Sequence, residues 1–299
     1  MCPPLPRRAA LLLLLALLGA ACGDAAGAGG GGSSSTGGGD LTLAPQNSTL
    51  LVGVNRISIA LLDAHQQPVN NATVQLDIDS GGTRVATRPL QWIGPTYDNK
   101  PVYNGTAHFA QSGSYTLIAH ATMPDGSTHT GRAAVSVTTK SPELPVAFKP
   151  PAVAQRIITD AGTRITDLDS GVPPDDWHTT TIAQGLAQHR PMLLYFGEPG
   201  FCMSAVCGPV VNILKQLCAS YCDKLLFEHI EVRTPPGAQG PFNPAYVAFG
   251  LSSEPWIYLV NAGGVVADRF EGPVTLDDLK GAVDGTLAGR VPAVDVTAG

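Results

Sequence analysis

Four cysteines lie close together in the C-terminal half of this 299-residue chain, at Cys202, Cys207, Cys218 and Cys222. Cysteine attacks other groups as a thiolate, and the start of a helix favours that form because free backbone amides and the helix dipole stabilise negative charge. The pattern predicts a helix from about residue 204 to residue 221. Cys202 and Cys207 therefore stand at its beginning, where a redox-active dithiol is expected.

The spacing of Cys202 and Cys207 limits how they can pair. Two residues five apart within one regular helix have Cα atoms about 8 to 9 Å apart, which exceeds the reach of a disulfide. A disulfide thus requires Cys202 in the preceding loop and Cys207 in or before the first turn. Pro209 fits this arrangement, because proline is tolerated early in a helix and clashes deep inside one.

Cys218 and Cys222 are four residues apart near the end of the same predicted helix, which places both thiols on one face. Two interpretations stand side by side. The pair forms a structural disulfide if the last turn frays, or Cys218 is an ordinary buried residue with Cys222 as its neighbour. An oxidising compartment favours pairing.

The elements expected around the cysteines alternate between strand and helix over residues 152–290. This order predicts an α/β domain, with a mixed central sheet and helices on both faces. The expected strands are 156–166, 192–196, 225–232, 256–260 and 265–270, and the expected helices are 180–189, 204–221, 243–249 and 276–287.

Two segments of this region, the run from Leu193 to Cys202 (LLYFGEPGFC) and Ser253-Glu254-Pro255-Trp256, together with the element order, resemble the thioredoxin superfamily. The resemblance implies a thioredoxin-like fold and thiol–disulfide oxidoreductase chemistry. It also implies that Pro255 is the cis-proline that lies against the reactive cysteine. The catalytic residues expected from it are Cys202, Cys207 and Pro255.

The cysteine spacing departs from that family. Four residues separate the thiols where the family has two, and Cys207-Gly208-Pro209-Val210 has valine in place of a second cysteine. In one register Cys202 is the nucleophile and Cys207 resolves it. In the other, Cys207 takes the nucleophile's place and has lost its usual partner.

Two other functions compete with thiol–disulfide exchange. Copper-delivery proteins of this superfamily use two cysteines and a distant histidine, and soft Cu(I) prefers thiolates. His178, His189 and His229 are the imidazoles of this region, and His229 is expected to be packed or surface-directed rather than ligating. A redox-inactive binding module is the third possibility. No cofactor and no resident metal ligands are predicted.

The segment from residue 41 to residue 140 contains short β-rich runs separated by turn residues. Expected strands are 50–54, 56–62, 73–78, 106–109, 114–121 and 133–138. The pattern predicts an all-β, immunoglobulin-like sandwich without a catalytic constellation. A Pro-rich linker, 141–151, separates the two domains, and residues 291–299 form a tail.

The first 22 residues indicate a lipoprotein-type signal peptide, with a basic start, an apolar run and Gly19-Ala20-Ala21-Cys22 as the cleavage site. Cys22 would then be lipidated, and the Gly/Ser-rich residues 23–40 would act as a tether. The sequence thus predicts an extracytoplasmic lipoprotein anchored to the membrane of a bacterial cell envelope. Its expected partners are extracytoplasmic protein thiols or a redox partner. Nucleic acid is not expected, because the net charge is −6 and Lys and Arg are not clustered.

Overall fold

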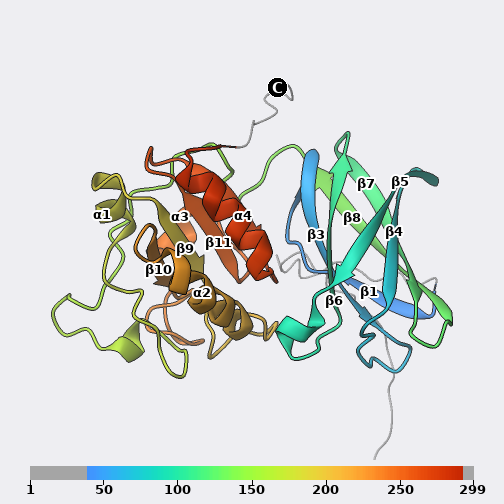
Figure 1. The fold of residues 1–299 in the computed structure, drawn as a ribbon, viewed down its shortest axis with the longest axis horizontal. Helices are drawn as coiled ribbons and strands as arrows, with labels where there is room; N and C mark the ends of the chain where they lie inside the picture. Colours follow the sequence, from blue (N-terminus) through green and yellow to red (C-terminus); the bar gives the residue numbers. More distant parts are fainter. Residues whose placement is uncertain (1–38, 292–299) are drawn as a thin grey trace, which may run out of the picture. The chain divides into compact units, whose positions relative to one another are not determined.

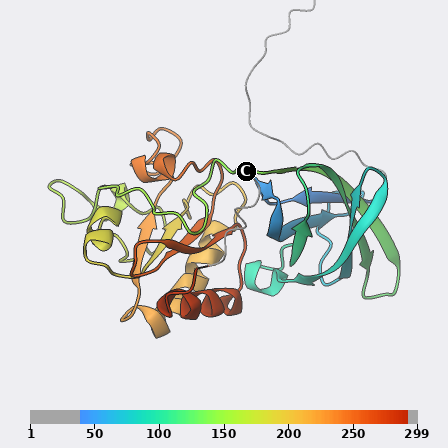
Figure 2. The ribbon, with the colours of Figure 1, turned by 90° about the horizontal axis from the view of Figure 1, so that it is seen from above.

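The computed structural model describes residues 39–291, which form an N-terminal β region and a C-terminal region of strands and helices (Figures 1 and 2). The expected signal peptide, the lipidated Cys22, nearly all of the tether and most of the tail lie outside the described residues. Within the described range, no helix has the length and apolar character needed to cross a membrane.

The N-terminal region is one sheet of eight strands that runs in the order β1-β3-β6-β5-β4-β7-β8-β2. Strand β1 pairs antiparallel with β3 and also parallel with β8, so the sheet closes on itself. The strands are β1 (Leu41–Pro45), β2 (Leu50–Leu51), β3 (Gly53–Leu62), β4 (Thr73–Ser80), β5 (Thr83–Trp92), β6 (Val102–Phe109), β7 (Gly113–Thr122) and β8 (Thr128–Thr138).

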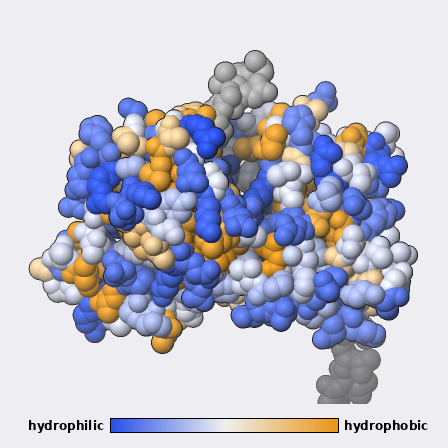
Figure 3. Space-filling model, viewed as in Figure 1, coloured by the Kyte–Doolittle hydropathy of each residue, from blue (hydrophilic) through white to orange (hydrophobic). Residues whose placement is uncertain are grey.

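Alternation along the strands fills the inside of this barrel. In β4, Val74, Leu76 and Ile78 are buried, and in β7 the residues Leu117 and Ala119 are buried in the same core cluster. Successive side chains of a strand point to opposite faces, so every second residue enters the interior. Polar residues take the outer positions, and hydrophilic and apolar side chains are interspersed on the face seen in Figure 3.

The expected immunoglobulin-like sandwich is wrong, because the structure has a closed barrel of seven strands with β2 added beside β8. A sandwich and a barrel both bury alternate residues, so the hydrophobic pattern does not distinguish them. The difference lies in the β1–β8 pairing, and residues 41–45 were not among the expected strands.

The C-terminal region contains a sheet of four strands in the order β10-β9-β11-β12. Strands β9 (Met192–Phe196) and β10 (Leu226–Ile230) are parallel, whereas β11 (Trp256–Val260) runs antiparallel to both β9 and β12 (Val266–Glu271). The helices are α1 (Ile182–Ala187), α2 (Cys207–Tyr221), α3 (Pro244–Ala248) and α4 (Leu276–Leu287).

The two faces of this sheet bury different side chains. In β9, Leu193 and Tyr195 belong to a core that includes residues of α2 and α4, whereas Leu194 and Phe196 belong to a core that includes residues of α1 and α3. All five residues of β9 are buried. The sequence of β9 is therefore a continuous apolar run, as expected for a strand covered on both faces.

The α/β thioredoxin-like class expected for residues 152–290 is also wrong. The chain is mostly β, and its described residues contain four α-helices, of which α1 and α3 have only six and five residues. The expected first strand is absent as well, because residues 156–166 form turns that lead into a 3-10 segment at Ile165–Asp167. Residues 156–166 contain three threonines, a glycine and an aspartate, which hydrogen-bond locally or bend the chain instead of joining a sheet.

The Pro-rich segment 141–151 lies along the C-terminal region. The N–H of Leu144 donates to the carbonyl of Phe249, the N–H of Ala147 donates to Val266, and the N–H of Val266 donates to Phe148. The boundary between the two regions at this segment stays a prediction.

Candidate functional site

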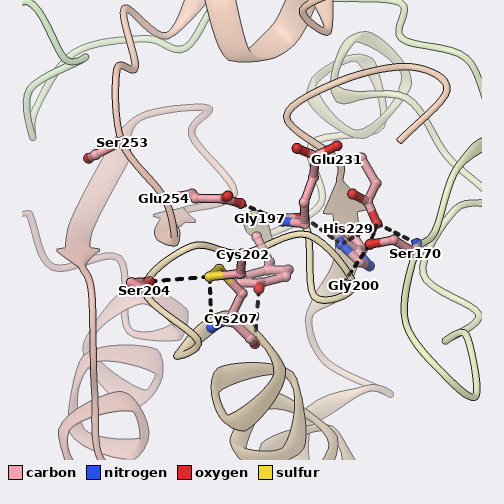
Figure 4. Close-up of a disulfide and its surroundings, with 12 residues drawn as sticks. Ser170, Gly197, Gly200, Cys202, Ser204, Cys207, His229, Glu231, Ser253 and Glu254 are labelled. Carbon is pink, nitrogen blue, oxygen red and sulfur yellow. Dashed lines mark hydrogen bonds and ion pairs between the residues drawn. A yellow bond between two sulfur atoms is a disulfide. The ribbon is translucent and has the colours of Figure 1, made fainter. Parts of the chain in front are cut away.

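Cys202 and Cys207 form a disulfide at the start of α2, with Cα atoms 6.0 Å apart. Cys202 lies in the loop after β9 and Cys207 is the first residue of the helix, as the spacing required. Ala205, between them, adopts a left-handed backbone with φ of 54° that turns the chain back toward the helix. Figure 4 shows the two sulfurs between this loop and the first turn of α2.

The two sulfurs have different surroundings. Cys207 is fully buried, whereas Cys202 is half-buried and is followed by Met203, which is fully exposed. The N–H of Cys207 donates to the sulfur of Cys202 over 3.3 Å, and the hydroxyl of Ser204 lies 3.2 Å from the same sulfur. Because Val206 provides no side-chain cap for α2, the Cys202 sulfur takes over part of that role.

Tyr195 forms a hydrogen bond with the backbone of Cys207. Its hydroxyl donates to the Cys207 carbonyl over 3.1 Å, and the Tyr195 side chain is fully buried. The hydrogen bond ties the helix start to the central strand β9. It fixes the position from which Cys207 meets Cys202.

Glu254 brings a carboxylate to the disulfide. A Glu254 oxygen and the sulfurs of Cys202 and Cys207 all lie within 4.8 Å of one another. Burial raises the pKa of Glu254 to about 7, although the N–H of Glu198 donates to its carboxylate and opposes the shift. A carboxyl group with this pKa can exchange a proton with a nearby thiol around neutral pH.

Pro255 is buried at the entry to β11, and the Glu254–Pro255 peptide bond is cis, as predicted. Of the residues predicted for the site, Cys202 and Cys207 meet directly, and Pro255 reaches them through its neighbour Glu254. The carboxylate of Glu254 was not among the predicted site residues. The acidic residue directly before the conspicuous proline was the available signal.

Cys218 and Cys222 also form a disulfide, with Cα atoms 4.6 Å apart at the end of α2. The last turn does not fray, because the N–H of Cys222 still donates to the Cys218 carbonyl over 2.9 Å. Both residues lie at the far end of α2 from Cys202. A structural role for this disulfide stays a prediction.

The side chains of His178 and His229 are buried together with those of Asp169 and Asp175. Burial alone would lower the pKa of His229, but hydrogen bonds with the two aspartates raise it well above the ordinary value. His229 is packed, as expected, with its ring 4.9 Å from the Tyr195 ring and its Nδ1 facing the carboxylates of Asp169 and Asp175. The sequence reasoning missed Asp169 and Asp175, whose spacing before His178 in one loop was the only signal.

No family model matches the chain, and no curated protein matches it. Among solved structures, CopC from Methylosinus trichosporium OB3b shares 14% identity at a TM-score of 0.23, over 31% of this chain and 86% of that chain. The PmoD soluble domain from Methylocystis sp. (Rockwell) shares 14% identity at 0.22, over 30% and 75%. A CARDB domain from Pyrococcus furiosus shares 14% at 0.20, over 34% and 97%.

These likenesses are too weak to define the fold or the function of this chain. They also do not bear on the resemblance of the cysteine segment to the thioredoxin superfamily, which stays a prediction.

Proposed function

We propose that the protein exchanges disulfides with extracytoplasmic thiols through Cys202 and Cys207. One observation carries the proposal: a half-buried Cys202 sulfur accepts the N–H of the first helical residue and is bonded to a fully buried Cys207. A helix N-terminus stabilises a thiolate on the sulfur that its amides face. This favours Cys202 as the attacking and attacked sulfur and Cys207 as the resolving one.

The exchange balances as follows. A client thiolate attacks the Cys202 sulfur, a client–Cys202 disulfide forms, and the Cys202–Cys207 bond breaks with Cys207 leaving as a thiolate. A second client thiolate then attacks the client sulfur of the mixed disulfide, which forms a client disulfide and releases Cys202. The client loses two electrons, the protein gains them, and the two protons pass to the cysteines. The reverse sequence reduces a client disulfide.

Glu254 supports proton movement in this scheme. Its carboxyl group lies beside both sulfurs and has a pKa of about 7. It can therefore protonate Cys207 as that sulfur leaves. The exposed Met203 and the exposed Phe201 flank Cys202 and provide apolar surface for an extended client segment.

The test is thiol trapping with the full chain in a series of glutathione redox buffers. In wild type, the Cys202–Cys207 pair should pass between a closed disulfide and a dithiol in one two-electron transition, followed by peptide mass spectrometry so that Cys218 and Cys222 are scored separately. Cys207→Ser should accumulate a mixed disulfide between Cys202 and glutathione, and Cys202→Ser should accumulate none. If Cys202→Ser traps glutathione and Cys207→Ser does not, the two roles are reversed. If neither variant traps it, exchange at this pair is rejected.

Copper handling is the second candidate function, because two sulfurs and one carboxylate oxygen lie within 4.8 Å. In the reduced protein two thiolates could hold Cu(I), which prefers soft sulfur ligands. Anaerobic titration of the reduced chain with Cu(I) against a competing chelator tests this. Tight binding that is lost in both Cys202→Ser and Cys207→Ser, without any trapping of glutathione, would favour copper over exchange.

A further inference from the structure

A second cluster of chemically active side chains lies behind the loop that carries Cys202. Asp169, Asp175 and His178 come from the loop before α1, and His229 comes from β10. The side chains of all four are at most 3% exposed. One nitrogen or oxygen of each lies within 4.8 Å of the corresponding atoms of the others.

Three of the four imidazole–carboxylate distances within this cluster are close to the edges of a metal coordination polyhedron. Nε2 of His178 lies 3.3 Å from Asp169 and 3.2 Å from Asp175, and Nδ1 of His229 lies 2.9 Å from Asp175 and 3.7 Å from Asp169. Metal–ligand bonds of about 2.0 to 2.2 Å in a tetrahedral zinc site separate neighbouring ligand atoms by about 3.3 to 3.6 Å. Both imidazoles thus face both carboxylates, three of the contacts are near ligand-to-ligand spacing, and the fourth, between His229 and Asp175, is a hydrogen bond of 2.9 Å.

The surrounding hydrogen bonds orient the four groups as ligands. Nε2 of His229 lies 3.0 Å from the Gly197 carbonyl and can only donate to it, which leaves Nδ1 as the nitrogen that faces the carboxylates. Asp169 accepts the N–H groups of Gly171 and Asp175, and Asp175 accepts the N–H of Trp177. Outer hydrogen bonds of this kind fix the tautomer of a ligating histidine and the position of ligating carboxylates.

The charge of the four side chains can be balanced in two ways. Two buried carboxylates carry two negative charges, which are neutralised by two protonated imidazoles or by one divalent cation with both imidazoles neutral. In the first arrangement His178 would share one proton between two carboxylates at 3.2 and 3.3 Å, longer than the roughly 2.7 to 2.9 Å of a charge-assisted hydrogen bond. In the second arrangement the same two distances from His178 are ordinary separations between ligands of one metal ion.

We propose that Asp169, Asp175, His178 and His229 bind a divalent metal ion, with zinc as the ion that this buried set of two imidazoles and two carboxylates suits best. Zinc accepts nitrogen and oxygen ligands in a closed four-coordinate site, and such structural sites stabilise the fold that surrounds them. No cysteine is needed, so the site is independent of the disulfide exchange proposed above.

The position of the site predicts a structural role for the ion. His229 holds the Gly197 carbonyl, and Ser170, the neighbour of Asp169, accepts the N–H of Gly200 through its hydroxyl. Figure 4 shows these contacts between the cluster and the loop that leads to Cys202. The ion would connect the loop before α1 to β10, and through them it would hold the backbone that positions Cys202.

The experiment uses the full chain with its disulfides closed, so that thiolates cannot bind metal. Elemental analysis after dialysis in metal-free buffer should find zinc in a one-to-one ratio to protein. After removal of the metal with a chelator, Co²⁺ should give the visible absorption of a tetrahedral N/O site, and added Zn²⁺ should displace it and raise the melting temperature. Mg²⁺ should do neither, because it prefers octahedral oxygen sites.

His178→Ala and Asp175→Asn should lose the Co²⁺ absorption, whereas the control His189→Asn should keep it. His189 is exposed and has a left-handed backbone, which asparagine tolerates. If His178→Ala does not fold, the wild-type titrations still decide. The proposal is overturned if wild type contains no metal and shows neither Co²⁺ absorption nor a Zn²⁺-dependent melting temperature. It is also overturned if the double variant Cys202→Ser/Cys207→Ser no longer binds the metal that wild type binds.

Discussion

The backbone N–H of Cys207 donates to the sulfur of Cys202 over 3.3 Å, so the first free amide of α2 faces the more exposed member of the disulfide. The relationship makes the pair asymmetric. After reduction, a thiolate on Cys202 keeps this donor, while Cys207 remains buried in the first turn. Cys202 is therefore both the more accessible of the two sulfurs and the one that is better stabilised as a thiolate.

We expect Cys202 to be alkylated at least about tenfold faster than Cys207 in the reduced protein, because only the thiolate reacts and the helix start stabilises it. Peptide mass spectrometry after short pulses of iodoacetamide measures the two rates. Cys207→Ser supplies the control, since its serine N–H still faces Cys202 and the fast rate should persist. Equal rates at both positions would contradict the assigned roles.

Glu254 should make stability depend on pH. Burial raises its pKa to about 7 in the folded protein, above the ordinary value of 4.5, so the folded state holds the proton more tightly than the unfolded state does. Its contribution to stability is therefore largest below pH 4.5 and is lost as the pH rises through 7. Glu254→Gln should flatten the melting temperature over this range relative to wild type. An unchanged pH profile in the variant would show that other groups cause the dependence.

The hydrophobic pattern predicted most strands of the N-terminal region but not its closure. Strand β7 alternates clearly and was expected within one or two residues of its observed ends. Strand β5 was missed because only Leu90 is buried among its ten residues, so it carries little apolar alternation. The pairing of Leu41 and Thr42 with β8 depends on long-range register, which local sequence does not encode.

The sequence predicted those parts of the candidate site that lie within one short segment of the chain. The positions of Cys202 and Cys207 followed from helix geometry and from the limited reach of a disulfide. The groups that act on the pair from elsewhere, such as the carboxylate of Glu254 and the hydroxyl of Tyr195, come from other strands and loops. No spacing rule within one segment reveals them.

The disulfide between Cys218 and Cys222 should contribute to stability without affecting exchange. It closes a loop of only five residues, for which chain entropy gives about 2 kcal/mol. Cys218→Ala/Cys222→Ala should lower the free energy of unfolding by about that amount, measured by denaturant titration. The rate at which Cys202 is alkylated should not change. A changed rate would show that the end of α2 is coupled to its start.

Membrane attachment is expected to depend on Cys22, the residue that follows the predicted cleavage site. One acyl chain binds a membrane only weakly, so stable attachment requires more than one chain or a second membrane contact. Cys22→Ser should move the protein from the membrane fraction to the soluble fraction in a bacterial host that processes lipoproteins. Intact-mass measurement of the mature wild type should show an acylated N-terminal Cys22. A mature chain with an unmodified Cys22 would reject the anchor.

Tyr195 and Tyr258 provide a matched pair for testing how the disulfide is held. Both tyrosines are fully buried in neighbouring strands of one sheet, β9 and β11. The Tyr195 hydroxyl donates to the carbonyl of Cys207, whereas the Tyr258 hydroxyl meets no hydrogen-bond partner within the described part of the chain. Replacing each with phenylalanine removes the same atom from two different environments.

Tyr195→Phe should lower the free energy of unfolding by about 1 kcal/mol, because a satisfied buried hydrogen bond is lost. It should also speed alkylation of Cys207 in the reduced protein, since the first turn of α2 loses its attachment to β9. Tyr258→Phe should change stability by less than about 0.5 kcal/mol or increase it, because an unpartnered hydroxyl is removed. Denaturant titration and pulsed alkylation of both variants measure these effects. Equal losses of stability with unchanged Cys207 reactivity would mean that Tyr195 fills space in the core and does not position the cysteine.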